Sequence, residues 1–153
     1  KTAFYDSLIS QLSALIEGEV DLVANLSNVS ALLNLLLDDL NWVGFYLLKS
    51  PEQLVLGPFQ GKPACLRIPV GRGVCGVAVA TGQTQRVVDV HAFVGHIACD
   101  TASNSEIVLP IFANGRIVAV LDIDSPLLAR FDAEDQIGLE RVATALENLR
   151  WNG

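Results

Sequence analysis

The sequence has no methionine, no long apolar run and no cluster of basic residues. A membrane-spanning helix needs roughly 18 or more consecutive apolar residues, whereas the richest apolar stretch, 31–37, is short and contains Asn34. We therefore expect no transmembrane segment. The 10 Lys and Arg residues are outnumbered by 17 Asp and Glu residues, which gives a net charge of −7. Such a charge repels phosphate backbones, so we expect no nucleic-acid partner.

Cysteine is also scarce, with Cys65, Cys75 and Cys99 and no Cys-x-x-Cys pair. An odd and low number of cysteines is not typical of a secreted disulfide scaffold. We therefore expect a cytoplasmic protein with reduced thiols. A zinc site built from these cysteines and His91 or His96 remains an alternative, but such sites usually contain closely spaced ligand pairs. The interpretation we prefer has no metal and no other cofactor.

What the sequence does contain suits one globular domain over residues 1–153. Hydrophobic residues make up 51% and charged residues 18% of the chain, far from the composition of a disordered protein. Apolar residues three or four apart predict helices over 4–16, over 22–36 and after Asp132. A short run of small residues predicts one more helix over 74–80.

Aromatic and β-branched runs bounded by Pro or Gly predict strands, which cover 41–48, 54–56, 64–70, 85–90, 106–112 and 116–124. Pro69 places the 64–70 segment at an edge of the sheet. The segment 91–105 has no clear period and is expected to be a loop. Because the strands are mostly consecutive, the order favours an α+β fold with an antiparallel sheet and helices packed on it.

The last two strands collect carboxylates on one face. Side chains alternate between the faces of a strand, so Ile and Leu residues line one face of this hairpin, and acids with valines line the other. We expect Glu106 to lie opposite Asp122, with Asp124 nearby. Three neighbouring carboxylates repel one another and raise at least one pKa. The alternative is that these acids lie on an exposed sheet edge or cap loops.

The expected register depends on the loop of the hairpin. A two-residue Asn114-Gly115 loop would pair Ala113 with Arg116 and mix acids with the apolar side chains. A three-residue loop with a bulge pairs Phe112 with Arg116 and keeps one face wholly apolar. Because register follows the hydrophobic pattern, we predict the three-residue loop.

Cys99 is a candidate nucleophile. It lies in the expected loop, with His96 three residues before it. A cysteine near an imidazole can have a lowered pKa and attack electrophiles. The alternative is that all three cysteines are small buried side chains.

Two further patterns have plain structural alternatives. The segment 71–76 matches a dinucleotide-binding fingerprint, with Asp89 near the required distance, but Pro69 disrupts the preceding strand and the following helix is short. We therefore interpret it as a tight turn. Trp42, Gly44 and Tyr46 share one face of a strand and either form a slot for a methyl or thioether group or pack as core aromatics.

Several longer motifs together resemble the free methionine-(R)-sulfoxide reductases, which are single-GAF-domain enzymes. The similarity runs from about residue 3 to residue 150. The matching segments are NWVGFY at 41–46, LGPFQGK at 56–62, RIPVGRGVCG at 67–76, GHIACD at 95–100, ASNSEIV at 102–108 and VLDIDS at 120–125.

The resemblance implies a GAF-like antiparallel sheet flanked by N- and C-terminal helices in a cytoplasmic homodimer. It further implies reduction of free L-methionine (R)-S-oxide with electrons from thioredoxin. A thiol must attack a sulfoxide while an acid delivers protons to the departing oxygen, and a carboxyl kept neutral by like-charged neighbours is such an acid. The alternative function is a GAF-type module that senses a small ligand without catalysis.

By the same resemblance, Cys99 is the nucleophile that becomes a sulfenic acid, Cys65 the resolving thiol and Cys75 a secondary thiol. The division of roles between Cys65 and Cys75 stays open. The resemblance also implies which residues bind the substrate: Trp42 and Tyr46 at the methylsulfinyl end, and the carboxylates of Glu106, Asp122 and Asp124.

Overall fold

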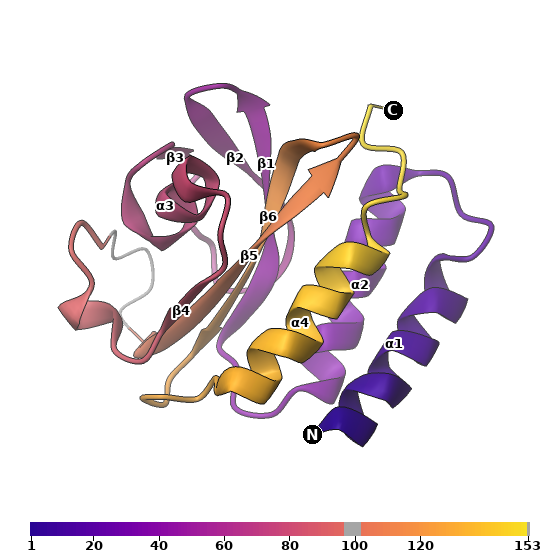
Figure 1. Cartoon of the computed structure of the whole chain (residues 1–153), viewed down its shortest axis with the longest axis horizontal. Coiled ribbons are helices and arrows are strands. Elements are labelled where there is room, and N and C mark those ends of the chain that lie inside the picture. The colour runs from indigo at the N-terminus through magenta and orange to yellow at the C-terminus, as the bar shows by residue number, and fades with distance from the viewer. Residues whose placement is uncertain (97–101, 153) are drawn as a thin grey trace.

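A computed structural model describes residues 1–96 and 102–152 of the chain (Figure 1). One six-stranded antiparallel sheet has the strand order β3-β2-β1-β6-β5-β4. Its strands are β1 (Trp42–Ser50), β2 (Gln53–Gly61), β3 (Arg67–Pro69), β4 (Gln85–Val87), β5 (Ser105–Ala113) and β6 (Arg116–Ser125). The helices are α1 (Thr2–Ile16), α2 (Leu22–Leu36), α3 (Gly73–Thr81) and α4 (Ala133–Ala145), with a short 3₁₀ turn over Val90–Ala92. The expected α+β architecture is confirmed.

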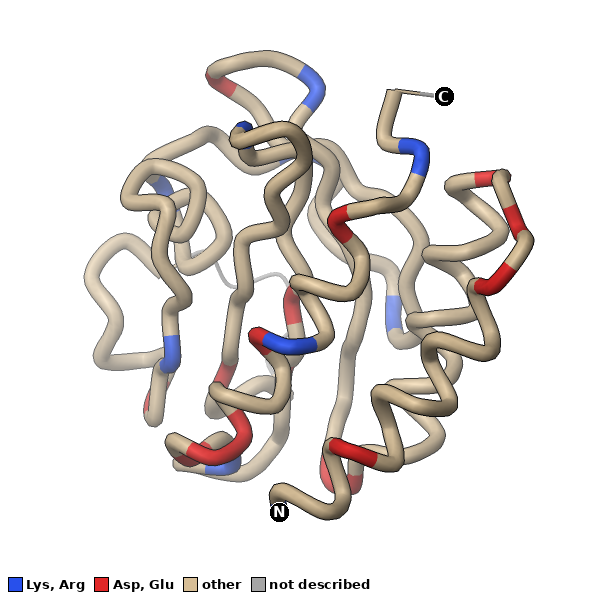
Figure 2. Tube along the Cα trace, turned by 45° about the vertical axis from the view of Figure 1, so that its right-hand side comes forward, with Lys and Arg blue, Asp and Glu red and all other residues tan. Residues whose placement is uncertain are grey.

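Helices α2 and α4 cover one face of the sheet, α1 packs against both of them on the same side, and α3 lies over the other face (Figure 1). Ile and Leu residues of β5 and β6 share one hydrophobic core with the three long helices, which includes Leu12, Leu33, Leu109, Leu121 and Leu139. Among the described residues, no helix combines the length and the apolar character that a membrane crossing requires. Figure 2 shows that Lys and Arg are spread over the fold and do not gather on one face.

The N-terminal helix differs in one position from the expected apolar stripe. Phe4 is 40% exposed, and Tyr5 is buried in its place. The ring of Tyr5 packs on Gly138 of α4, where even a Cβ atom would approach the ring to 2.2 Å. Its hydroxyl donates to Asp135 Oδ1 at 2.7 Å. A phenol can satisfy this buried carboxylate and a phenylalanine cannot, which explains why the stripe is displaced.

Three of the expected strands differ from the observed ones by more than two residues at one end. The segment expected at 54–56 extends over Gln53–Gly61, because it pairs with β1 along most of its length. The segments expected at 64–70 and 85–90 shorten to Arg67–Pro69 and Gln85–Val87. Both short strands lie at the sheet edges, as expected for β3 from Pro69.

The predicted loop of the last hairpin is wrong, but the prediction of which side chains lie on each face of the hairpin is right. Ala113 pairs with Arg116 around a two-residue turn in which Asn114 and Gly115 have φ of 54° and 77°, as a type I′ turn requires. A bulge between Ile111 and Phe112 then shifts the register by one residue. The extra residue therefore lies inside the strand and not in the turn. It restores the alternation of apolar and polar side chains that the hydrophobic pattern predicts.

The bulge changes which acids are direct partners. Glu106 lies opposite Asp124, and Val108 lies opposite Asp122. The expected pairing of Glu106 with Asp122 is therefore wrong by two residues. A register shift of two residues leaves each side chain on the same face of the sheet. All three carboxylates therefore remain on the side away from the long helices.

The fingerprint segment 71–76 forms a tight turn. The amide of Gly71 donates to the carbonyl of Gly76 at 2.8 Å. A Cβ atom on Gly76 would meet the carbonyl oxygen of Pro69 at 2.4 Å. The glycines serve close packing at the start of α3, which has nine residues.

Candidate active site

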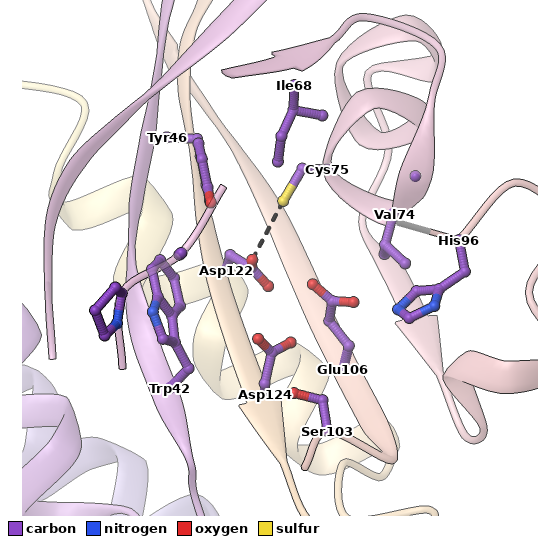
Figure 3. A pocket seen from close by; sticks show the side chains of 13 residues that line it. Trp42, Tyr46, Ile68, Val74, Cys75, His96, Ser103, Glu106, Asp122 and Asp124 are labelled. Atoms are coloured by element: carbon purple, nitrogen blue, oxygen red, sulfur yellow. Dashed lines mark hydrogen bonds between the residues drawn. The ribbon is translucent and has the colours of Figure 1, made fainter. Parts of the chain in front are cut away.

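The face of the sheet away from the long helices contains a partly open cavity of about 50 Å³. Strands β1, β5 and β6 form its floor, α3 and the segment 63–64 form its walls, and His96 lies at its side (Figure 3). Volume of this size accommodates a few water molecules. Thirteen residues line it: Trp42, Tyr46, Pro63, Ala64, Ile68, Gly73, Val74, Cys75, His96, Ser103, Glu106, Asp122 and Asp124.

The three carboxylates predicted from strand alternation converge in this cavity (Figure 3). Glu106 and Asp122 are 7% and 6% exposed, so the alternative of an exposed acidic edge does not hold for them. Burial raises the pKa of Glu106 well above its usual value, and the charges of Asp122 and Asp124 raise it further. Burial also raises the pKa of Asp122. The site therefore favours protonated carboxyl groups at pH values where exposed carboxyls are ionised.

Cys75 projects from the first turn of α3 onto the carboxylates. Its thiol is free and buried, and its Sγ donates to Asp122 Oδ2 at 3.3 Å. Burial raises the pKa of this thiol, and the nearby charges of Asp122 and Glu106 raise it further. Cys75 is thus held as a thiol, which is a donor to Asp122 and a weak nucleophile. The other oxygen of Asp122, Oδ1, is buried and accepts no hydrogen bond within the described part of the chain.

Trp42 and Tyr46 reach the cavity from the same face of β1, as expected. Their rings stack with centroids 5.8 Å apart, and Trp42 also stacks on Phe59 at 5.1 Å. The slot suggested at Gly44 is not open, because a Cβ atom there would lie 2.2 Å from the Cβ of Phe59. Phe59 of β2 fills this space, so the aromatic wall is continuous on that side.

The cysteines expected to do redox chemistry are only partly described. Cys99 lies within 97–101, outside the described residues, so its expected proximity to His96 is not tested. Cys65 lies between β2 and β3 and is disulfide-bonded, whereas Cys75 is a free thiol. His96 lines the cavity, and burial together with the nearby His91 lowers its pKa.

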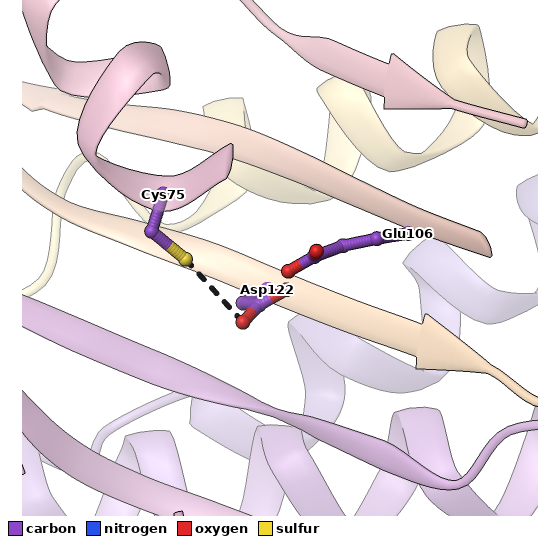
Figure 4. A group of neighbouring side chains, drawn as sticks. All are labelled: Cys75, Glu106 and Asp122. Atoms are coloured by element: carbon purple, nitrogen blue, oxygen red, sulfur yellow. Dashed lines mark hydrogen bonds between the residues drawn. The ribbon is translucent and has the colours of Figure 1, made fainter. Parts of the chain in front are cut away.

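One group of side chains in the described part of the chain has the spacing of metal ligands (Figure 4). One ligand atom each of Cys75, Glu106 and Asp122 lies within 4.8 Å of the others. This set differs from the cysteine and histidine set that the sequence suggested, since neither His91 nor His96 belongs to it. A thiol and two carboxyls are ligands that zinc accepts, but each of them must first lose its proton.

Sequence reasoning missed several cavity residues. Ile68 and Val74 supply apolar walls, and Ser103 is 5% exposed and accepts a hydrogen bond from Asn41 Nδ2 at 3.0 Å. These residues have no individual chemical signature. Each nevertheless lies within a segment that carries the family resemblance, 67–76 for Ile68 and Val74 and 102–108 for Ser103.

The chain is similar to known proteins over nearly its whole length. A family model described as the GAF domain matches residues 28–149. The free methionine-R-sulfoxide reductase of Escherichia coli (strain K12) is 58% identical over 149 residues, which are 97% of this chain and 90% of the relative. The protein of the same name from Saccharomyces cerevisiae (strain ATCC 204508 / S288c) is 45% identical over 150 residues, or 94% and 83% of the two chains. The X-ray structure of free methionine-R-sulfoxide reductase from Neisseria meningitidis in complex with its substrate has a TM-score of 0.91 and 49% identity, covering 95% of this chain and 87% of that one.

Proposed function

The chain belongs to the GAF-domain family of free methionine-R-sulfoxide reductases, and on this premise we propose that it reduces free L-methionine (R)-S-oxide to L-methionine in the acidic cavity. The observation that carries the proposal is the convergence of Glu106, Asp122 and Asp124 beside a stacked aromatic wall. A sulfoxide has one polar oxygen and one apolar methyl group on the same sulfur. The cavity offers a carboxyl donor for the first and aromatic surface for the second.

Proton donation is the task of the carboxyl groups. The sulfoxide sulfur becomes electrophilic when its oxygen accepts a strong hydrogen bond or a proton. Glu106, whose pKa is raised by burial and by its acidic neighbours, supplies that proton. Asp122 and Asp124 keep it protonated and bind the substrate.

The electrons come from thiols. The thiolate of Cys99 attacks the sulfoxide sulfur, the oxygen passes to Cys99 as a sulfenic acid, and methionine leaves with both electrons. The thiol of Cys65 then attacks the sulfenic sulfur, water departs and a disulfide forms. Cys65 is disulfide-bonded and Cys75 is a free thiol donating to Asp122, which supports Cys65 for the resolving role. Cys75 serves as a secondary thiol within the carboxyl network.

An external dithiol closes the cycle. Thioredoxin reduces the enzyme disulfide by thiol–disulfide exchange and becomes oxidised itself. The balanced reaction converts methionine sulfoxide and reduced thioredoxin to methionine, water and oxidised thioredoxin. A cytoplasmic setting supplies this reductant, and a homodimer is the assembly we propose there.

A coupled assay tests this proposal and its alternative, a ligand-sensing module without catalysis. Thioredoxin, thioredoxin reductase and NADPH are supplied with free (R)- or (S)-methionine sulfoxide, and NADPH consumption is followed. We expect turnover of the (R) isomer alone and none in Cys99→Ser. Binding of the (R) isomer without turnover would support the sensor, and full turnover in Cys99→Ser would remove the proposed nucleophile. Mass mapping of the oxidised chain is expected to recover a Cys65–Cys99 bridge rather than one to Cys75.

A further inference from the structure

Cys65 lies in a short irregular segment, 62–66, that connects the end of β2 to the start of β3. Pro63 and Ala64 of this segment form part of the cavity wall. At its C-terminal end the carbonyl of Leu66 accepts a hydrogen bond from the amide of Leu56 at 3.0 Å. The position of Cys65 within this segment therefore also depends on the hydrogen bonds made by its own carbonyl and by the carbonyls before it.

Two aromatic side chains of β1 hold those carbonyls. Trp42 Nε1 donates to the carbonyl oxygen of Lys62 at 3.2 Å. The hydroxyl of Tyr46 donates to the carbonyl oxygen of Cys65 itself at 2.8 Å. The two bonds thus fix one end of the segment and the backbone of Cys65, whose sulfur is disulfide-bonded in this structure.

Both donors belong to one stack of aromatic rings. The ring of Trp42 stacks between those of Phe59 and Tyr46, with interplanar angles of 15° to Phe59 and 24° to Tyr46. Trp42 and Tyr46 are each 2% exposed. Burial and the nearby charge of Asp122 raise the pKa of Tyr46, so its hydroxyl keeps its proton and remains a donor throughout the physiological range.

We propose that Trp42 and Tyr46 are positioning residues for the resolving thiol, which they hold through the Lys62 and Cys65 carbonyls in reach of a sulfenic acid. This role is separate from any contact of their rings with substrate, because it uses the indole N–H and the phenol O–H. It rests on the proposed function of Cys65. Misplacement of reacting groups by about 1 Å can cost on the order of 100-fold in rate, so loss of one such bond should slow disulfide formation measurably.

The variants Tyr46→Phe and Trp42→Phe remove the donors and keep a ring in the stack. Single-turnover reactions with free (R)-methionine sulfoxide are followed in two ways: methionine release reports sulfenic acid formation, and loss of free thiol reports disulfide formation. We expect Tyr46→Phe to slow disulfide formation by about 10-fold to 100-fold more than it slows methionine release. The sulfenic acid should then accumulate and be trapped by dimedone. Trp42→Phe should show the same pattern more weakly, because its partner carbonyl is three residues from the thiol.

Tyr5→Phe is the matched control, since it also deletes a buried tyrosine hydroxyl, the one that donates to Asp135 on the other face of the sheet. It should leave the ratio of the two rates unchanged. Dithiothreitol, which reduces a sulfenic acid directly, should restore turnover in Tyr46→Phe where thioredoxin does not.

Disulfide formation at the wild-type rate in both variants would overturn the proposal. Equal slowing of methionine release and disulfide formation would also overturn it, because the donors would then act on the substrate. If the wild-type chain released no methionine at all, the proposed function itself would fail, and this result is distinct from either of the others. Should Tyr46→Phe not fold, Trp42→Phe alone decides.

Discussion

Buried carboxylates on the two sides of the sheet have different partners. Under the long helices, Asp135 is 2% exposed and is paired with Lys1 Nζ at 2.6 Å and Arg130 Nη1 at 3.4 Å, and it accepts the Tyr5 hydroxyl. On the cavity face, Glu106 and Asp122 are nearly as buried but face each other and a thiol. Within residues 1–96 and 102–152, no Lys or Arg forms an ion pair with either of them.

Because of this difference, we expect the carboxylate on the helical side to affect stability and the carboxylates in the cavity to affect the reaction. A carboxylate paired with cations supports the fold, whereas clustered carboxylates without cations retain protons at a cost to stability. Strands β5 and β6 supply apolar side chains to the core under the helices and acidic side chains to the cavity, because alternate residues point to opposite faces. One face can therefore be apolar and rigid while the other keeps a reactive cluster.

The largest expected effect comes from Asp122→Asn, which leaves the helical face untouched. Loss of a group that supports proton transfer typically lowers a rate by about 10²–10⁴-fold, so we expect kcat to fall by that amount. The free energy of unfolding should stay constant or rise, because a buried ionisable group is removed. Steady-state assays and urea unfolding measure the two quantities.

Leu121→Ala, one residue earlier on β6, is the counterpart of Asp122→Asn. Its side chain is fully buried against the long helices, and such truncations cost about 2–5 kcal/mol. We expect that loss in urea unfolding, with kcat per folded molecule unchanged. A large fall in kcat for this variant would mean that the two faces are not independent.

A smaller loss is expected from Asp135→Asn. The carboxylate also completes the capping box of α4 with Asp132. Breaking a fully buried ion pair costs roughly 3–5 kcal/mol, and we expect less here because Lys1 is 39% exposed and screened by solvent. Differential scanning calorimetry should record a lower Tm, while the single-turnover rate of methionine release stays at the wild-type value.

The pH dependence of stability should have opposite signs for the two faces. Asp132, hydrogen-bonded to Lys1 and Asp135, has a pKa lowered to about 2 from 3.8, so its contribution is present above the unfolded pKa and is lost as pH falls through the folded one. Glu106 and Asp122 have raised pKa values, so their contribution is present below their unfolded values of 4.5 and 3.8 and is lost as pH rises through the folded ones. The unfolding free energy should therefore pass through a maximum in mildly acidic solution.

Single variants distinguish the two limbs of this pH profile. Asp132→Asn should flatten only the acidic limb, and Glu106→Gln should flatten only the limb above the maximum. Equal slopes in all three proteins would show that these carboxyls do not titrate differently in the folded and unfolded chains.

The smallest expected effect is that of metal removal. The proposed chemistry uses protonated carboxyls and thiols, so dialysis against EDTA should leave turnover unchanged. Added Zn²⁺ should inhibit by displacing protons from Cys75, Glu106 and Asp122. Loss of activity on chelation, with recovery on adding zinc, would instead make the cluster a metal centre.

Sequence patterns predicted most of the elements and the composition of each face of the hairpin, because hydrophobic alternation has a strict period. They could not locate the bulge between Ile111 and Phe112. One extra residue in the turn or anywhere along the strand restores the same alternation of apolar and polar side chains. They also missed the choice of Tyr5 over Phe4, because it depends on Asp135 of a helix 130 residues away. The filling of the Gly44 site by Phe59 depends on the pairing of β1 with β2, which composition does not specify.

The most direct test of the acidic cavity as the reaction centre is a single turnover without reductant. The reduced wild-type chain, Asp122→Asn and Leu121→Ala are each mixed with free (R)-methionine sulfoxide, and methionine is quantified against time. We predict about one methionine per chain in all three, because two thiols supply two electrons, with a rate reduced on the order of 100-fold or more only in Asp122→Asn. A wild-type rate in Asp122→Asn would contradict the account.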